Sequence, residues 1–246
     1  TGGTALYANN MIRLGIDESG ADINVGGIIN GINETVGTNN FYFNSIYIGG
    51  SSVSSGSSNT FALNSSVTVN ARNYLNNIFY NARSNSGSTG KHYAIKVGGS
   101  GTNPTGLTLN YNDYYVTGTG GFIGQYNAID QTTLADWRTS IGQDCNSISG
   151  DPKYNNQNGS ASTVDLHISA SLASVVEAGG TNISSITQDF DNQTRSTLSP
   201  TDIGADAGNF IVNDISGPGI SLTPLLAACG TGDIALNNVN IVDASG

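Results

Sequence analysis

Charged side chains are scarce in this 246-residue chain and make up only 11% of it. The chain has eight basic and eighteen acidic residues, which gives a formal net charge of −10. A phosphate backbone needs a stripe of Lys and Arg, and these few scattered cations cannot form one. Nucleic acid is therefore excluded as an expected partner. The low charge density fits a secreted protein that is kept in solution by hydroxyl and amide groups.

Cysteines and long apolar runs are also rare. The two cysteines, Cys145 and Cys229, form no C-x-x-C pair, so a thiolate zinc site has no support. Two incidental thiols and a disulfide between the main domain and the C-terminal tail both fit this spacing. No run of 18 apolar residues is present, and we expect no membrane span. The chain starts at Thr1 without Met or a signal peptide, so we expect a piece of a longer protein.

The most informative feature is a short phrase that returns about every 34 residues. Each copy begins with an asparagine followed by alternating apolar positions, and the intervals are 34, 32 and 36 residues. The asparagines are Asn10, Asn44, Asn76 and Asn112. An Asn before an apolar alternation is a turn residue that leads into a strand. A repeat of this length is typical of stacked units that bury their faces against their neighbours.

Two further strand signals lie between successive phrases, separated by turns rich in Gly, Ser and Asn. About three strands per 34-residue coil, with no crossover helix, predict an all-β fold, a right-handed parallel β-helix with a short C-terminal β tail. A β-propeller has a similar period but needs four antiparallel strands per blade. A left-handed hexapeptide helix is excluded because no six-residue period is present.

The rhythm breaks after Gly118. The sequence predicts a single helix, over residues 132–141, with Thr132 or Thr133 as the N-cap. Strand phrases resume at residues 165–168, and the Gly217-Pro218-Gly219 sequence marks a boundary. We therefore expect a β-helix over residues 1–213. Residues 214–246 would be a linker and a partial sandwich-like module or assembly tail, ordered only by packing on other surfaces.

Several phrases resemble the right-handed parallel β-helix proteins of the pectate-lyase-like superfamily, in particular large secreted surface proteins of Bacteroidetes type. The resemblance is carried by residues 76–81, 111–115, 133–137, 142–144, 150–152, 165–168 and 202–205. The stretch from Gly219 to Leu225 looks like the opening of an immunoglobulin-like module. The resemblance implies an extracellular or cell-surface protein, exported by a type IX secretion route. It does not imply one activity, since this fold hosts lyases, hydrolases, adhesins and stalks.

Polysaccharide lyases of this superfamily hold calcium with carboxylates beside an Arg or Lys that takes a proton. Asp113 is the only acidic residue in the Asn phrases, and its counterparts Met11, Ser45 and Asn77 cannot complete an acidic cluster. The basic residues on the repeating strands have no acidic partners at matching positions; they are Arg13, Arg72, Arg83, Lys91 and Lys96. We therefore expect no catalytic residues of this kind and no depolymerase activity.

One run of oxygen-bearing side chains suits calcium, and it comprises Asp189, Asp191 and Asn192. The competing interpretation is a capping loop in which Arg195 pairs with Asp202 or Asp206. His92 and His167 have no imidazole or thiol neighbour at ligand spacing, and we expect both to be ordinary strand residues.

An aromatic series follows the third position after each Asn, namely Tyr47, Phe79 and Tyr115, with Arg13 in the first unit. If these side chains face outward, they form a column with about 4.8 Å between coils, which suits stacking on sugars. The alternative is strand propensity, with the rings covered by a loop or stacked for stability. A register slip of one residue would exchange the two faces.

These observations favour a non-catalytic extracellular segment of a large bacterial surface or filament protein, with a structural or adhesive role. Its expected partners are surface glycans or other copies of itself. The alternative is a polysaccharide-binding or polysaccharide-degrading, lyase-like β-helix. An ice-binding β-helix needs regularly spaced Thr, and no Thr recurs at matching positions in the Asn phrases.

Overall fold

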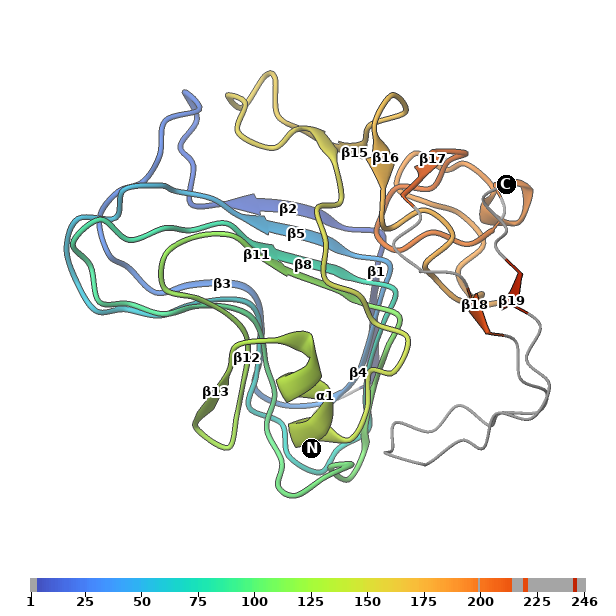
Figure 1. The fold of residues 1–246 in the computed structure, drawn as a ribbon, viewed down its shortest axis with the longest axis horizontal. Coiled ribbons are helices and arrows are strands. Elements are labelled where there is room, and N and C mark those ends of the chain that lie inside the picture. Colours follow the sequence, from blue (N-terminus) through green and yellow to red (C-terminus); the bar gives the residue numbers. More distant parts are fainter. Residues whose placement is uncertain (1–3, 199, 214–218, 221–240, 243–246) are drawn as a thin grey trace.

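The computed structural model describes residues 4–198, 200–213, 219–220 and 241–242. Its main body is a parallel β-solenoid of about four turns, which confirms the predicted fold class. Figure 1 shows the coils stacked on one another, with the second strand of each coil lying alongside its counterparts. Each coil contributes one strand to each of three sheets, as the sequence predicted.

The three sheets are named here in chain order. Sheet 1 contains β1 (Thr4–Ala8), β4 (Thr38–Tyr42), β7 (Arg72–Leu75) and β10 (Leu107–Asn110). Sheet 2 contains β2 (Met11–Leu14), β5 (Ser45–Ile48), β8 (Ile78–Asn81) and β11 (Asp113–Val116). Sheet 3 contains β3 (Ile29–Glu34), β6 (Thr60–Ser65), β9 (His92–Lys96) and β12 (Gly121–Tyr126), and β13 (Ile129–Gln131) adds an antiparallel edge strand.

The corner between sheets 1 and 2 has the same two-residue construction in every coil. Its first residue adopts a left-handed backbone, with φ of 56° at Asn9, 54° at Phe43, 59° at Asn76 and 56° at Tyr111. The second residue is always an asparagine. The left-handed residue turns the chain sharply, and the asparagine that follows starts the next strand.

These second asparagines form a continuous ladder along the solenoid. The side-chain oxygen of Asn77 accepts hydrogen bonds from the backbone nitrogen of Asn44 at 3.0 Å and from its amide nitrogen at 2.8 Å. Asn77 in turn donates to the side chain of Asn112 at 3.0 Å, and Asn44 receives the same contact from Asn10 at 2.7 Å. Each buried amide is thus satisfied by the coils above and below it.

The ladder corrects the register of the third repeat. Its asparagine is Asn77, because Ser45 pairs with Ile78 in the parallel ladder. The expected Asn76 occupies the left-handed corner position instead. The sequence could not show which of the two adjacent asparagines begins the repeat, since asparagine suits both positions of the corner.

The interior is filled by apolar side chains from all three sheets. Aromatic rings at equivalent positions stack from coil to coil, as Phe41 does on Tyr74 at 5.3 Å and Phe79 on Tyr114 at 5.9 Å. Complete burial of one such side chain contributes about 1.5–3 kcal/mol, so the stack is a main source of stability.

Helix α1 (Leu134–Ile141) packs against the fourth coil and confirms the predicted helix. Thr133 is the N-cap and exchanges hydrogen bonds with Asp136 in a capping box. Trp137 and Ile141 are fully buried and belong to the solenoid core. A methyl group on Gly124 would lie 2.4 Å from the Trp137 ring, so this close approach requires glycine.

The regular coils end before residue 213, and this corrects the predicted extent of the β-helix. Ile148 adds one parallel bridge beside Asp113, and the Ser147 hydroxyl accepts a hydrogen bond from the backbone N–H of Asn112 at 2.9 Å, which ends the ladder. The chain then leaves the coil and folds over sheet 2 and the corner beside it. We call residues 151–198 and 200–213 the covering segment.

The covering segment contains β14 (Tyr154–Asn156), β15 (Asp165–Ile168), β16 (Ala173–Ser174), a short 3-10 helix (Arg195–Thr197) and β17 (Ile211–Val212). The strand phrase at 165–168 is real, but β15 pairs antiparallel with β14 and does not continue the solenoid. Leu166, Ile168 and Ile203 form a second core with Tyr47 and Tyr80 from the outer face of sheet 2. This apolar outer face is the physical reason that the segment turns back.

The expected tail of residues 214–246 lies mostly outside the described residues, as does Cys229. Within the tail, β18 (Gly219–Ile220) and β19 (Ile241–Val242) pair antiparallel. The packing predicted for the tail stays a prediction.

Candidate functional site

A group of ionisable side chains lies on the covering segment. On β15, Leu166 and Ile168 point into the second core, so alternation turns Asp165 and His167 toward the opposite, half-exposed side. Asp191 comes from the following loop and Asp206 from the stretch before β17. We call Asp165, His167, Asp191 and Asp206 the His167 cluster.

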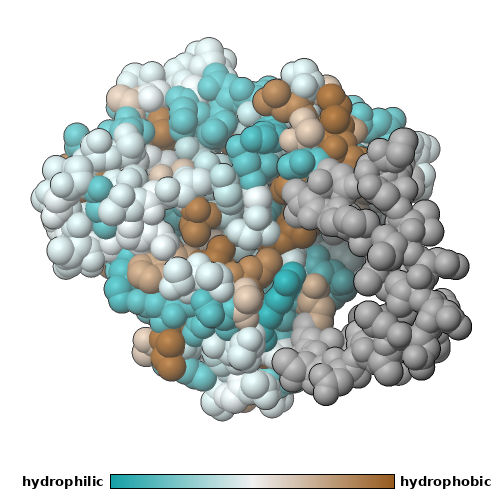
Figure 2. Space-filling view, viewed as in Figure 1, coloured by the Kyte–Doolittle hydropathy of each residue, from teal (hydrophilic) through white to brown (hydrophobic). Residues whose placement is uncertain are grey.

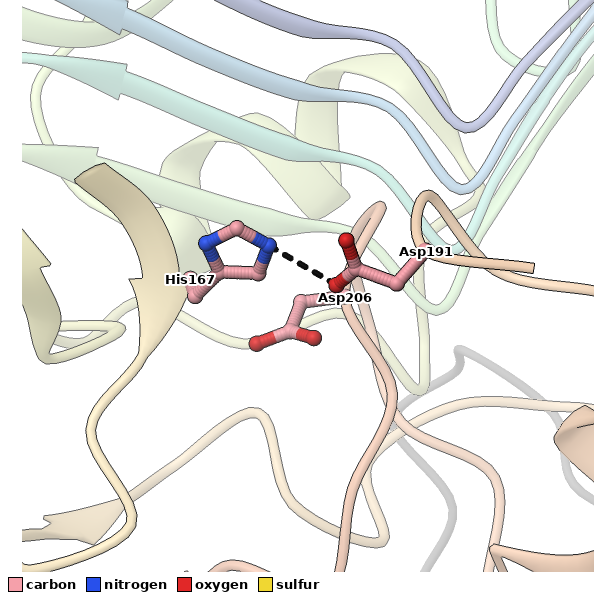
Figure 3. Close-up of side chains that lie close together, drawn as sticks. All are labelled: His167, Asp191 and Asp206. Carbon is pink, nitrogen blue, oxygen red and sulfur yellow. Dashed lines mark hydrogen bonds and ion pairs between the residues drawn. The ribbon is translucent and has the colours of Figure 1, made fainter. Parts of the chain in front are cut away.

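The imidazole of His167 is held on both of its nitrogens. Its Nδ1 lies 2.5 Å from Oδ1 of Asp165, and its Nε2 lies 2.8 Å from Oδ2 of Asp191. Figure 3 shows the second of these contacts, with the Asp206 carboxyl group beside the ring. One ligand atom each from His167, Asp191 and Asp206 lies within 4.8 Å of the other two.

Backbone amides fix two of the carboxylates. The His167 amide donates to Asp165 at 2.9 Å, and the Ile168 amide donates to Asp206 at 2.7 Å. Asp206 is buried, whereas the side chain of Asp191 retains 42% of its exposure. The cluster therefore has an anchored side and a side that is free to adjust.

The charges in the cluster depend on one another. Burial raises the pKa of Asp206 to about 6, although the Ile168 amide and the His167 ring oppose this shift. Burial also disfavours the imidazolium of His167, but the hydrogen bond to Asp165 and the charges of the three carboxylates outweigh it and raise the His167 pKa. A positive charge on or beside this ring is thus the favoured state.

Two members of the cluster, Asp165 and His167, line a groove of about 410 Å³ together with Met11, Arg13 and Phe190. The Arg13 guanidinium donates to the carbonyl oxygen atoms of Gly159 at 2.6 Å and of Asp17 at 3.3 Å. Its donors are therefore directed toward backbone groups on the rim of the groove.

The predicted calcium residues do not come together as ligands. Asp189 is buried and accepts the amides of Asp191 at 3.0 Å, Gln193 at 2.8 Å and Ala207 at 3.3 Å. Asn192 adopts a left-handed backbone with φ of 65°. These contacts give the run a hydrogen-bonded loop structure, and of its three residues only Asp191 reaches the cluster.

Arg195 also differs from its expected role. Its guanidinium donates to the carbonyl oxygen atoms of Gly204 at 3.0 Å and Ala205 at 2.9 Å and stacks over the Phe43 ring at 3.9 Å. No hydrogen bond to Asp202 or Asp206 is present among the described residues. The guanidinium thus ties the covering segment to the corner of the solenoid.

The aromatic column has a different composition and environment from those predicted. Tyr47 pairs with Tyr80, which replaces Phe79 because of the register shift, and Phe79 is fully buried in the interior. Tyr154 of the covering segment packs on Tyr47 and Tyr80, and Tyr47 donates to Asn158 at 2.7 Å. The rings are covered, as the alternative interpretation expected, and only Tyr115 stays half-buried. Glycan binding by the protein stays a prediction.

Both histidines lie in strands as predicted, but His167 is not isolated. Its partners lie 24 and 39 residues further along the chain, at Asp191 and Asp206. The only local signal was the alternation of Asp165 and His167, which places both side chains on one face of a strand.

A second acidic pair is buried within the covering segment. Burial raises the pKa of Asp202 to about 7 against the hydrogen bonds from the Gly208 and Ala178 amides, and the nearby Glu177 carboxylate adds to the rise. Asp202 accepts those amides at 2.9 and 3.0 Å, and Glu177 accepts the Phe210 amide at 2.9 Å. These bonds hold the two carboxyl groups close together.

Comparison with known proteins finds no matching family model, curated protein or solved structure. No helix among the described residues is long and apolar enough to cross a membrane. Any function must therefore be argued from the geometry.

Proposed function

We propose that this chain is a non-catalytic, extracellular segment of a large bacterial surface protein, with a structural and adhesive role. The observation that supports this proposal is the use of its arginines. All five guanidinium groups donate to backbone carbonyl oxygens. The arginines of the chain therefore stabilise its own fold.

Two of these arginines are buried in the solenoid and link different parts of its coils. Arg72 donates to the carbonyl oxygen of Thr105 at 3.0 Å and to that of Gly98 at 2.8 Å. Arg83 donates to the carbonyl oxygen of Val25 at 2.8 Å and to that of Gly49 at 3.3 Å. Both side chains are at most 1% exposed, which leaves no room for a substrate beside them.

The lysines are also engaged. Lys91 pairs with Asp130, and Lys153 pairs with Asp151 at 2.9 Å. Lys96 lies over the Phe61 ring at 5.4 Å. A lyase needs an accessible basic group beside the proton it removes, and a cation committed to a carbonyl, a carboxylate or a ring is poorly suited to that task.

The surface supports a role in solution outside the cell. Hydrophilic and weakly polar residues cover most of the face in Figure 2, and hydrophobic residues gather in small patches. A low charge density with many amides and hydroxyls suits a chain that must stay extended and soluble over long times. The stacked coils supply the stiffness that a spacer or stalk needs.

Incubation with pectin, alginate and related acidic glycans in the presence of calcium tests the catalytic side of the proposal. We expect no unsaturated products absorbing in the ultraviolet, and their appearance would establish the lyase-like alternative. The adhesive side is tested by displaying the chain on bacterial cells and measuring their retention on glycan-coated surfaces under flow. Retention no greater than that of bare cells would leave only a spacer role.

A further inference from the structure

The Nε2 atom of His167 faces the Asp191 carboxylate, and this contact needs a positive charge between the two groups. An ionised Asp165 accepts hydrogen bonds and cannot donate one. Its contact with Nδ1 therefore assigns the proton of the ring to that nitrogen. In the neutral ring, Nε2 then presents a lone pair to the Asp191 carboxylate at 2.8 Å. A lone pair and a carboxylate repel one another unless a proton or a cation lies between them.

The charges around this point are mostly negative. Asp165, Asp191 and Asp206 surround the ring, and Asp189 lies behind Asp206 and acts on its charge. The hydrogen bonds of the Arg195 guanidinium go to the carbonyl groups of Gln188, Gly204 and Ala205 and to Asn9. The guanidinium of Arg13 likewise faces carbonyl oxygen atoms.

We propose that His167, Asp191 and Asp206 bind one divalent cation of the zinc class, and that Asp165 orients the imidazole for it. A carboxylate on the far nitrogen of a ligating histidine is the usual support of such sites, because it fixes the ring and makes it more basic. This inference rests on the geometry of the His167 cluster and does not depend on the proposed function.

The donor set decides between metals. Zinc accepts a histidine nitrogen together with carboxylate oxygens at about 2.0–2.2 Å, whereas calcium prefers six to eight oxygen ligands. The spread of up to 4.8 Å between ligand atoms is wider than a tetrahedral site requires. Asp191 can close this gap, because its side chain is the most exposed of the three ligands.

The cation would join three separate pieces of the covering segment. His167 lies on β15, Asp191 on the loop that follows Asp189, and Asp206 on the stretch before β17. Metal binding would therefore stabilise the fold of the covering segment, and the effect would be visible as a higher unfolding temperature.

The test uses the full chain, freed of metal with a chelator, and titrates it with Zn²⁺, Co²⁺ or Ca²⁺ alone at a fixed pH of 7.5. We expect saturable 1:1 binding of Zn²⁺ by calorimetry, a visible Co²⁺ spectrum typical of a low-coordinate site, and weaker binding of Ca²⁺. Zn²⁺ should also raise the unfolding temperature.

Four variants locate the ion. His167→Ala and Asp191→Asn should abolish the Co²⁺ spectrum, and Asp165→Asn should weaken Zn²⁺ binding about 10-fold through the loss of ring orientation. Glu18→Gln removes an exposed carboxylate outside the cluster and should change nothing. Thermal unfolding in the presence of chelator confirms that each variant is folded.

Three results would overturn the proposal. They are the lack of saturable binding of Zn²⁺ up to about 1 mM, an affinity for Zn²⁺ that is unchanged in both His167→Ala and Asp191→Asn, and a preference for Ca²⁺ over Zn²⁺. The first result would identify a proton as the only positive charge shared by the cluster.

Discussion

The buried side chains of Arg72 and Arg83 donate hydrogen bonds to backbone carbonyl groups of other segments of the chain. A buried carbonyl without a donor costs about 1–3 kcal/mol, so each guanidinium offsets more than its own desolvation only while its contacts are complete. Arg83 illustrates this, because it reaches carbonyl groups 34 and 58 residues away in the sequence.

Replacing Arg83 with Met should lower the free energy of unfolding by about 2–4 kcal/mol, since the carbonyl groups of Gly49 and Val25 lose their donor. Urea unfolding followed by circular dichroism measures the loss. The control is Lys96→Met, which removes a cation that lies over Phe61 and should change stability by less than about 0.5 kcal/mol. Equal effects of the two substitutions would contradict a structural role for Arg83.

The carboxyl pair of Asp202 and Glu177 makes stability depend on pH. Because the Asp202 pKa in the folded protein is about 7, above the ordinary 3.8, its protonated form is favoured by folding. The stabilising contribution is fully present below pH 4 and is lost as the pH rises through 7.

Glu177→Gln should reduce this loss, because the Gln amide can donate to Asp202 and removes the carboxylate charge that raises the Asp202 pKa. We expect the variant to be more stable than the parent at pH 7.5 by about 1 kcal/mol, with the difference vanishing near pH 4. Urea unfolding of both proteins between pH 4 and 8 measures it. A difference that is constant across this range would exclude the carboxyl pair as its source.

At the scale of elements, the asparagine ladder adds side-chain hydrogen bonds between coils to the backbone pairing and the ring stacking. Asn77 lies in its middle and bonds to Asn44, Asn112 and the Phe41 carbonyl oxygen. Asn10 lies at its end and is exposed. The same substitution at these two positions therefore removes different numbers of buried hydrogen bonds.

Asn77→Ala should destabilise the protein by about 3 kcal/mol or more, and Asn10→Ala by about 1 kcal/mol or less. Thermal unfolding of the two variants gives the comparison. If both substitutions cost the same, the ladder would not act as a connected unit.

Much of the solenoid was readable from the sequence because its corners use one residue type. Asn and a short apolar alternation mark a turn and a strand wherever they occur, so four coils and helix α1 were found. The extent was overestimated at residues 165–168, since a strand phrase carries no information about whether its partner is parallel. Strand β15 instead packs on the apolar outer face of sheet 2, where Leu166 and Ile168 share a core with Tyr47 and Tyr80.

The candidate site was less accessible to sequence reasoning. Asp191 was selected for its neighbours Asp189 and Asn192, yet its contact is with His167 on a different element. Asp206 was considered only as a partner of Arg195. Contacts across 24 and 39 residues depend on how a loop-rich segment folds back, and no periodicity encodes that path.

At the scale of the whole molecule, two cores share sheet 2 as a common wall, with the solenoid interior on one side and the covering segment on the other. Asn76 is one of the ties between them, because its side chain donates to the Thr181 carbonyl oxygen at 2.7 Å and accepts the Thr181 amide at 2.9 Å. These two bonds can be removed without straining the corner, since glycine tolerates the same φ.

Asn76→Gly should therefore loosen the covering segment selectively. We expect amide hydrogen exchange to become about 10-fold faster in peptides around Thr181, with rates in β5 and β8 unchanged. Asn103→Gly provides the matched control, because Asn103 is exposed and has a similar φ of 55°. Uniform acceleration along the chain would show instead that the two cores unfold as one unit.

The four corners between sheets 1 and 2 are all two residues long, whereas the connections on the other sides of the coil differ in length. Three residues separate β3 from β4, six separate β6 from β7, and ten separate β9 from β10. The connections from sheet 2 to sheet 3 also vary in length, so the variation falls at the two junctions where no asparagine ladder imposes a register. Foreign peptides inserted within residues 100–103, the exposed part of the connection between β9 and β10, would leave the Gly98 and Thr105 carbonyl groups in place for Arg72. This position therefore offers a place to graft new sequence without altering how the coils stack.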